Sequence, residues 1–128
     1  MTQTELEALA RKWQQRLRLQ DWTFDLRLCR FYDVDRDQLG ECRAVLRKQM
    51  AIIKVLDPAD YDPSLMGAYD PERTLVYELL HCRLLGIGPD YDDGSVSALM
   101  EEHAVHALAT LLVEMDRASV QAHGADGS

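Results

Sequence analysis

The sequence contains no apolar run that approaches the roughly 20 residues a transmembrane helix needs, so we expect no membrane partner. Its opening segment, MTQTELEALARKW, also lacks the apolar core of a secretory signal peptide, which predicts a cytoplasmic protein. Basic residues are scarce as well: 14 Lys and Arg stand against 22 Asp and Glu, and the formal net charge is -8. Because such a charge repels phosphate, we expect no nucleic acid partner.

Cysteine is rare, and its spacing forms no motif. Cys29, Cys42 and Cys82 are an odd number at wide intervals, which favours reduced, packed thiols over disulfides or a cysteine-based zinc site. The sequence also has no P-loop, dinucleotide fingerprint or serine nucleophile elbow. The chain has 128 residues, of which 47% are hydrophobic and 28% are charged. This length and composition are typical of one soluble globular domain.

The spacing of apolar residues predicts an α+β fold. Helices are expected over 3–18, 71–85 and 95–119, and strands over 22–31, 41–49 and 50–57. The expected arrangement is an N-terminal helix, a small three-stranded, mostly antiparallel sheet and two C-terminal helices. Residues 1–119 would form a single domain, and residues 120–128 a flexible C-terminal tail.

Local signals mark the starts of two helices. Thr4 and Glu7 have the spacing of a capping box in the first helix. Asp70, Pro71 and Glu72 suit an N-cap, a first-turn proline and an anion near the positive end of the helix dipole. The second helix is therefore expected to begin at Asp70-Pro71.

This second helix carries YELLH, Tyr77 to His81, which differs by one residue from the zinc-binding pattern HELLH. Glu78 precedes His81 by three residues and Tyr77 precedes it by four, so the three side chains project from neighbouring parts of one helix face. In HELLH the two imidazoles bind zinc, and the glutamate deprotonates the metal-bound water. The alternative is an ordinary buried helix in which His81 makes a hydrogen bond inside the fold.

The surrounding sequence extends this likeness. TLVYELLHCRLL is followed, after a loop, by MEEHAVHALATLLVEMDR, and together they resemble the small phage and prophage zincin-like metallopeptidases. The resemblance covers about Asp21 to Arg117, and it implies a minimal zincin-like fold and, for a phage-encoded chain, the cytoplasm of a bacterial host. It also implies that Glu78 is the general base and that His81 and Glu102 are zinc ligands. The chain departs from the family pattern where Tyr77 occupies the first ligand position.

Tyr77 weakens the expected zinc site. A phenol must lose a proton with a pKa near ~10 before it binds zinc, whereas a neutral imidazole need not. His106 lies four residues after Glu102 and, if the two helices are antiparallel, approaches the level of Tyr77. Three roles stay open: Tyr77 or His106 is the third zinc ligand, or His106 accepts a hydrogen bond from the Tyr77 hydroxyl. Zinc is accordingly expected to be weakly bound or absent.

Two functions follow from the resemblance. The departure at Tyr77 favours a degenerate member of the family that binds a peptide or a protein. The presence of Glu78, His81 and Glu102 favours instead an active zinc-dependent peptidase with a non-standard ligand set.

An acidic loop and an apolar stripe have simpler interpretations. The loop Asp90–Asp93 does not match the spacing of a calcium-binding loop, and a solvated loop is expected. The stripe of Leu108, Leu111, Leu112 and Met115 is either core or the face of a homodimer.

Overall fold

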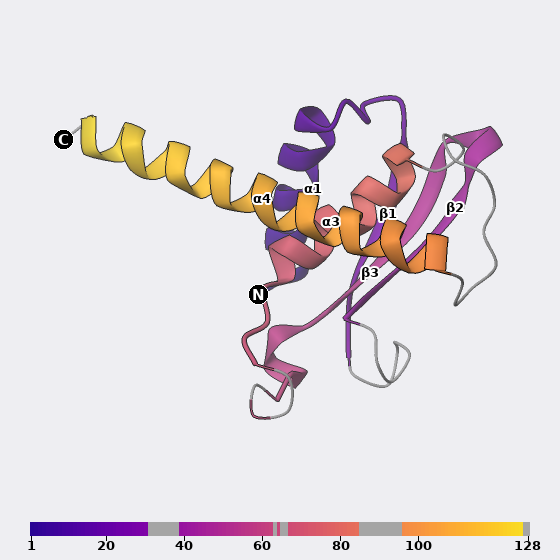
Figure 1. Cartoon of the computed structure of the whole chain (residues 1–128), viewed down its shortest axis with the longest axis horizontal. Helices are drawn as coiled ribbons and strands as arrows, with labels where there is room; N and C mark the ends of the chain where they lie inside the picture. The colour runs from indigo at the N-terminus through magenta and orange to yellow at the C-terminus, as the bar shows by residue number, and fades with distance from the viewer. Residues whose placement is uncertain (31–38, 63, 65–66, 85–95, 127–128) are drawn as a thin grey trace.

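The computed structural model describes residues 1–30, 39–62, 64, 67–84 and 96–126 (Figure 1). In chain order the elements are α1 (Gln3–Arg16), β1 (Thr23–Cys29), β2 (Gly40–Val45), η2 (Leu46–Lys48), β3 (Met50–Leu56), η3 (Pro58–Asp60), α3 (Pro71–Leu84) and α4 (Val96–Asp126). The predicted α+β class and the order of helices and strands are confirmed. No helix in the described part of the chain is long and apolar enough to cross a membrane.

The sheet has the order β1-β3-β2, with β3 in the centre. The strand β3, MAIIKVL, is the most continuously apolar of the three, and its buried positions alternate along most of its length. It pairs parallel with β1 and antiparallel with β2, so the sheet is mixed, whereas a mostly antiparallel sheet was expected. The chain reverses direction from β1 to β2 and again from β2 to β3, and β3 lies between the other two strands, so its pair with β1 is parallel.

One face of the sheet carries the hydrophobic core. The inward residues of β3, which are Ala51, Ile53 and Val55, are at most 5% exposed and pack against α1 and α3. The helix α3 lies between the sheet and α4, which crosses its outer side (Figure 1). Because α3 is covered on both sides, its only exposed residue is Arg83.

The helix ends agree in part with the sequence signals. Asp70 caps α3 as predicted, since its Oδ1 accepts a hydrogen bond of 3.1 Å from the Glu72 amide. For α1 the predicted cap was wrong: the helix begins at Gln3, and the Thr2 hydroxyl, instead of Thr4, accepts from the Glu5 amide at 3.1 Å. The same helix ends at Arg16 and not at residue 18, because Arg18 adopts a positive φ of 60°.

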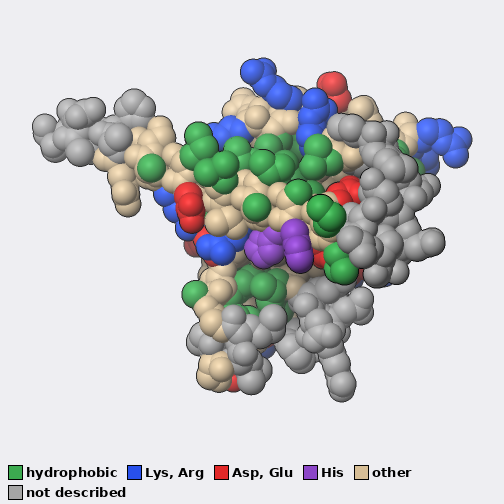
Figure 2. Space-filling model, in the orientation of Figure 1, with side chains coloured by type: hydrophobic (Ala, Val, Ile, Leu, Met, Phe, Trp, Pro, Cys, Tyr) green, Lys and Arg blue, Asp and Glu red, His purple; other side chains and the backbone are tan. Residues whose placement is uncertain are grey.

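The helix α4 runs past the predicted end at Ser119 and continues to Asp126. Its 31 residues correspond to a length of about 46 Å, and its C-terminal half extends beyond the rest of the domain in Figure 1. Three residues of the apolar stripe are exposed and are therefore not core: Leu108 at 43%, Leu111 at 51% and Met115 at 60%. Hydrophobic side chains are visible along α4 in Figure 2. The acidic loop Asp90–Asp93 lies outside the described residues.

A cluster of charged side chains connects α4 to α1 and α3, and this cluster was not predicted from the sequence. Glu72 and Asp116 are 8% and 9% exposed, and Lys12 contacts their carboxylates at 2.8 Å and 2.9 Å. The Trp13 indole donates to Glu72 Oε2 at 2.7 Å, and Arg117 donates to Glu72 Oε1 at 3.1 Å. Both buried carboxylates are thus paired with cations from other elements, as burial of charge requires.

Candidate functional site

The YELLH segment lies in the middle of α3 and presents side chains to two different layers. Glu78 faces β2, and Tyr77 and His81 lie toward α4. The helix α4 runs antiparallel to α3, since Tyr77 meets Glu102 whereas the earlier Glu72 meets the later Arg117. This direction agrees with the antiparallel packing on which the sequence argument for His106 depended.

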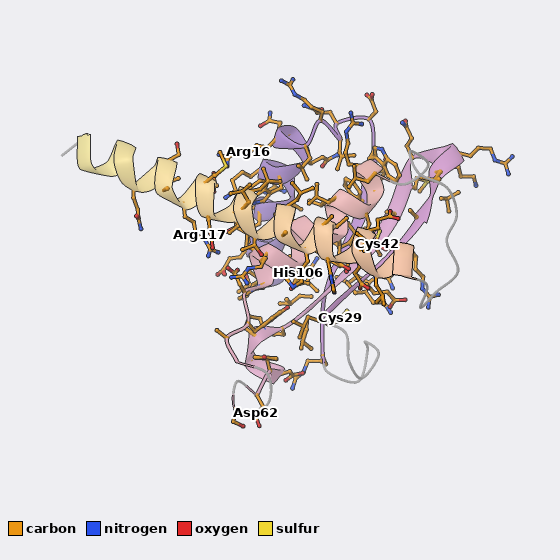
Figure 3. The ribbon with its side chains drawn as sticks, in the orientation of Figure 1. Arg16, Cys29, Cys42, Asp62, His106 and Arg117 are labelled. Atoms are coloured by element: carbon orange, nitrogen blue, oxygen red, sulfur yellow. The ribbon has the colours of Figure 1, made fainter. Side chains whose placement is uncertain are left out.

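Tyr77 is the centre of the contacts between the motif and α4. Its ring lies edge-on to the His81 ring, with centroids 4.6 Å apart and an interplanar angle of 87°. The His106 ring is the next neighbour, at 5.7 Å and 66°. Figure 3 shows His106 on α4 in front of this region, and histidine side chains appear beside α4 in Figure 2. The three rings form one aromatic cluster between the helices.

The Tyr77 hydroxyl donates a hydrogen bond of 2.9 Å to Glu102 Oε1. His106 was one candidate for this acceptor, and the structure has Glu102 in that role instead. A hydroxyl has one hydrogen, and a carboxylate is the stronger acceptor. Burial raises the pKa of Tyr77, and the hydrogen bond and negative charge of Glu102 raise it further. The phenol therefore keeps its proton near neutral pH and donates it in the hydrogen bond to Glu102.

Glu78 is a buried carboxyl at 6% exposure. Burial raises its pKa to about 8, with smaller contributions from the negative charges of Glu41 and Glu102. Among the described residues, none makes a hydrogen bond with the Glu78 side chain. Near neutral pH most of the population therefore carries a protonated Glu78, a form that can donate a proton as well as accept one after ionisation.

Gly40 explains how β2 approaches Glu78 so closely. A β carbon at this position would stand 2.6 Å from a Thr74 methyl group, 3.0 Å from the Lys54 carbonyl oxygen and 3.4 Å from Glu78 Cγ. Only glycine leaves room for this contact, and it places Glu41, the next residue, near the Glu78 carboxyl. Sequence reasoning missed both residues, because a glycine at the start of a strand has no motif that points to a helix.

His81 stays neutral at physiological pH. Burial lowers its pKa, and the nearby charges of Glu102 and Glu101 only partly oppose that effect. His81 is half-buried, whereas His103 and His106 on α4 are exposed. A neutral imidazole of this kind accepts or donates one hydrogen bond and can bind a metal ion.

The described residues do not fit a catalytic zinc site. Such a site has three protein ligands and an open fourth position. Of the residues that the resemblance implies, His81 and Glu102 are near each other, but Glu102 is already held by the protonated Tyr77. Within the described ranges, no group of three or more His, Cys, Asp or Glu side chains is placed to hold a metal ion. In the sequence pattern of the family that the chain resembles, a histidine stands at the position of Tyr77.

The two edges of the sheet differ in whether they are covered. The side-chain amide of Gln3 donates to the Leu26 carbonyl at 2.6 Å and accepts from the Leu28 amide at 2.9 Å. It pairs with the outer edge of β1 as a neighbouring strand would. At the other edge no strand from the described part of the chain pairs with β2. The strand β2 lies next to Glu78 of α3, because Gly40 is in close contact with that residue.

No family model, curated protein or solved structure compared with the chain matches it. The likeness to zincin-like metallopeptidases therefore depends on the residues of the two helices alone.

Proposed function

We propose that this protein is a degenerate zincin-like metallopeptidase that binds peptides without cleaving them. The observation that carries the proposal is the 2.9 Å hydrogen bond from the Tyr77 hydroxyl to Glu102. It joins the first ligand position of the motif to a residue that the family would use for zinc. A phenol with a raised pKa makes this contact without a metal, and it stabilises the packing of α3 on α4.

The outer edge of β2, which pairs with no strand among the described residues, supports a peptide as the ligand. The Leu39 carbonyl accepts from the Leu56 amide at 2.9 Å, so these two residues form a hydrogen-bonded pair. In an antiparallel ladder such pairs recur at every second residue, here at Glu41 and Arg43. The residues that alternate with these positions, such as Ala44, direct their amide and carbonyl groups away from β3. An extended peptide can form main-chain hydrogen bonds with these groups.

The charges around the site favour a peptide with basic residues. The exposed Glu101 and Glu102 lie on the α4 side of the site, near His81. Together with a net charge of -8, these carboxylates attract cationic side chains and steer them toward the site. Binding should therefore weaken as the salt concentration rises.

The experiment compares Ala44→Pro with the matched control Ala44→Val. Proline removes the outward amide of β2 but is tolerated at a strand edge, whereas valine keeps the amide and has a similar size. Fluorescence anisotropy with extended ten-residue peptides of differing charge measures the affinity. We expect basic peptides to bind best, Ala44→Pro to bind them at least about tenfold more weakly, and Ala44→Val to bind them normally. Equal binding by both variants, or no preference for basic peptides, would contradict the proposal.

A zinc-dependent peptidase is the second candidate, and Glu78 is the observation that favours it. A buried carboxyl with a pKa of about 8, three residues before a neutral His81 on the same helix, is typical of a general acid or base. This candidate requires that Tyr77 release Glu102. Stoichiometric zinc in the purified protein, with peptide cleavage that Glu78→Gln abolishes, would establish the peptidase and exclude the non-catalytic proposal.

A further inference from the structure

Two of the three cysteines meet across the interface between β2 and α3. The sulfur atoms of Cys42 and Cys82 are 3.3 Å apart, although the residues are separated by 40 positions in the sequence. Cys82 is 3% exposed, and Cys42 is partly exposed. The wide spacing predicted reduced, packed thiols, and no pattern in the sequence indicates that these two are neighbours.

The contact follows from the small residues on the inner face of β2. Gly40 lies against Thr74 and Glu78 of α3, and Cys42, two residues later on the same strand face, lies against Cys82, one helical turn after Glu78. Two residues along β2 and one turn along α3 cover similar distances, so both pairs of residues meet across the interface. The same close approach that the glycine permits brings the two thiols together.

Cys29 is in a different environment. It lies on β1 in a separate apolar cluster with Leu56, and its thiol donates to the Arg27 carbonyl at 3.5 Å. The chain thus contains one pair of adjacent thiols and a third thiol that serves as an internal control.

We infer that Cys42 and Cys82 form a dithiol that closes to an intramolecular disulfide on reaction with a small disulfide oxidant such as glutathione disulfide. The closed form ties β2, an edge strand, to α3. A disulfide bond is about 2.05 Å long, so the sulfur atoms need to approach by little more than ~1 Å from their present separation. This inference concerns the folded chain itself and holds whether or not a peptide binds at the β2 edge.

The reaction balances without any other oxidant. One thiol of the pair loses its proton to solvent and attacks one sulfur of glutathione disulfide, which forms a mixed disulfide and releases one glutathione thiolate. The other thiol then loses its proton and attacks the protein sulfur of the mixed disulfide, which releases the second glutathione thiolate. Two protein thiols are oxidised, one glutathione disulfide is reduced to two thiols, and the two thiolates recover the two protons.

Closure should stabilise the folded protein. The new bond would close a loop of about 40 residues, and a cross-link over such a loop restricts the unfolded chain. It joins elements that are already in contact, so the native structure needs little adjustment. The oxidised protein should therefore melt several degrees above the reduced protein, about 5 °C or more.

The test uses the full chain, reduced, desalted and then incubated with glutathione disulfide. We expect mass spectrometry to show the loss of two hydrogen atoms with no retained glutathione, and peptide mapping to show Cys42 joined to Cys82. The Cys29→Ser variant should close in the same way. Cys42→Ser and Cys82→Ser should not close, and any glutathione they take up should remain attached.

Three results would overturn the inference. One is a folded wild-type protein that keeps all three thiols after incubation, and another is a stable glutathione adduct in place of the internal bond. The third is a closed form that melts at or below the temperature of the reduced protein, because that would mean the native contact does not accommodate the bond.

Discussion

Replacing Glu78 with glutamine should change how the stability of the metal-free protein depends on pH. The carboxyl is 6% exposed, and burial raises its pKa to about 8 from an ordinary value of 4.5. Below pH 4.5 both the folded and the unfolded chain hold the proton, so ionisation has no effect on stability. Between pH 4.5 and 8 the unfolded chain ionises while the folded chain stays protonated, and stability falls as the pH rises.

The size of the effect follows from the pKa difference. At 1.36 kcal/mol for each pKa unit, the full loss above pH 8 is roughly 4–5 kcal/mol. Glutamine is close in shape to a protonated glutamate and cannot ionise, so Glu78→Gln should escape this loss. The free energy of unfolding of the variant, relative to wild type, should rise by a few kcal/mol from pH 5 to pH 9.

Urea denaturation of both proteins at pH 5, 7 and 9 in the presence of a chelator measures this difference. Other titrating groups are common to both proteins and cancel in the comparison. The exposed Glu114 supplies a control, Glu114→Gln, that removes a charge of the same kind from the surface of α4. If the difference between Glu78→Gln and wild type does not change with pH, Glu78 ionises normally in the folded protein and the argument from burial fails.

Two further substitutions test the packing around the site, with urea denaturation as the assay. Lys12→Met should lower the free energy of unfolding by about 2–3 kcal/mol, because it leaves the buried carboxylates of Glu72 and Asp116 with fewer cations. The control Arg11→Met, at an exposed position, should change the free energy of unfolding by less than about 0.5 kcal/mol. Equal effects of the two substitutions would contradict the role of the charged cluster. Gly40→Ala should cost about 1–3 kcal/mol, since its β carbon would stand 2.6 Å from a side-chain methyl group of α3; an unchanged stability would mean that β2 does not approach α3 so closely.

The sequence predicted those parts of the fold that depend on neighbouring residues. Alternation in TFDLRLC and the apolar run MAIIKVL located two strands, and Asp70-Pro71 located the start of α3. The direction of β1 relative to β3 was not predictable in this way. The two strands form a parallel pair because β3 lies between β1 and β2 in the sheet, and no local pattern indicates that strand order.

The same limit applies to the candidate site. Tyr77, Glu78 and His81 were identified because their spacing lies within one helix. The partner of the Tyr77 hydroxyl was missed because Glu102 and His106 are one turn, about 5.4 Å, apart on α4, and the packing of the helices decides between them. Glu41 and the Cys42–Cys82 contact depend on β2 lying beside α3, a tertiary contact with no sequence motif.

The resemblance to zincin-like metallopeptidases stays a prediction. The arrangement of α3 and α4 brings Tyr77, His81 and Glu102 together, which is compatible with that family, but the same contacts would serve an ordinary helix interface. What distinguishes the two is whether the position of Tyr77 can become a metal ligand when the residue is changed.

Zinc titration calorimetry on the parent protein and on Tyr77→His therefore tests the central claim most directly. If Tyr77 stands in a vacated ligand position, the parent should bind no stoichiometric zinc, whereas Tyr77→His should bind about one zinc per chain through the new imidazole, His81 and Glu102. Adding Glu102→Ala to that variant should abolish the binding. Stoichiometric binding by the parent, or a folded Tyr77→His protein that binds no zinc, would contradict the account.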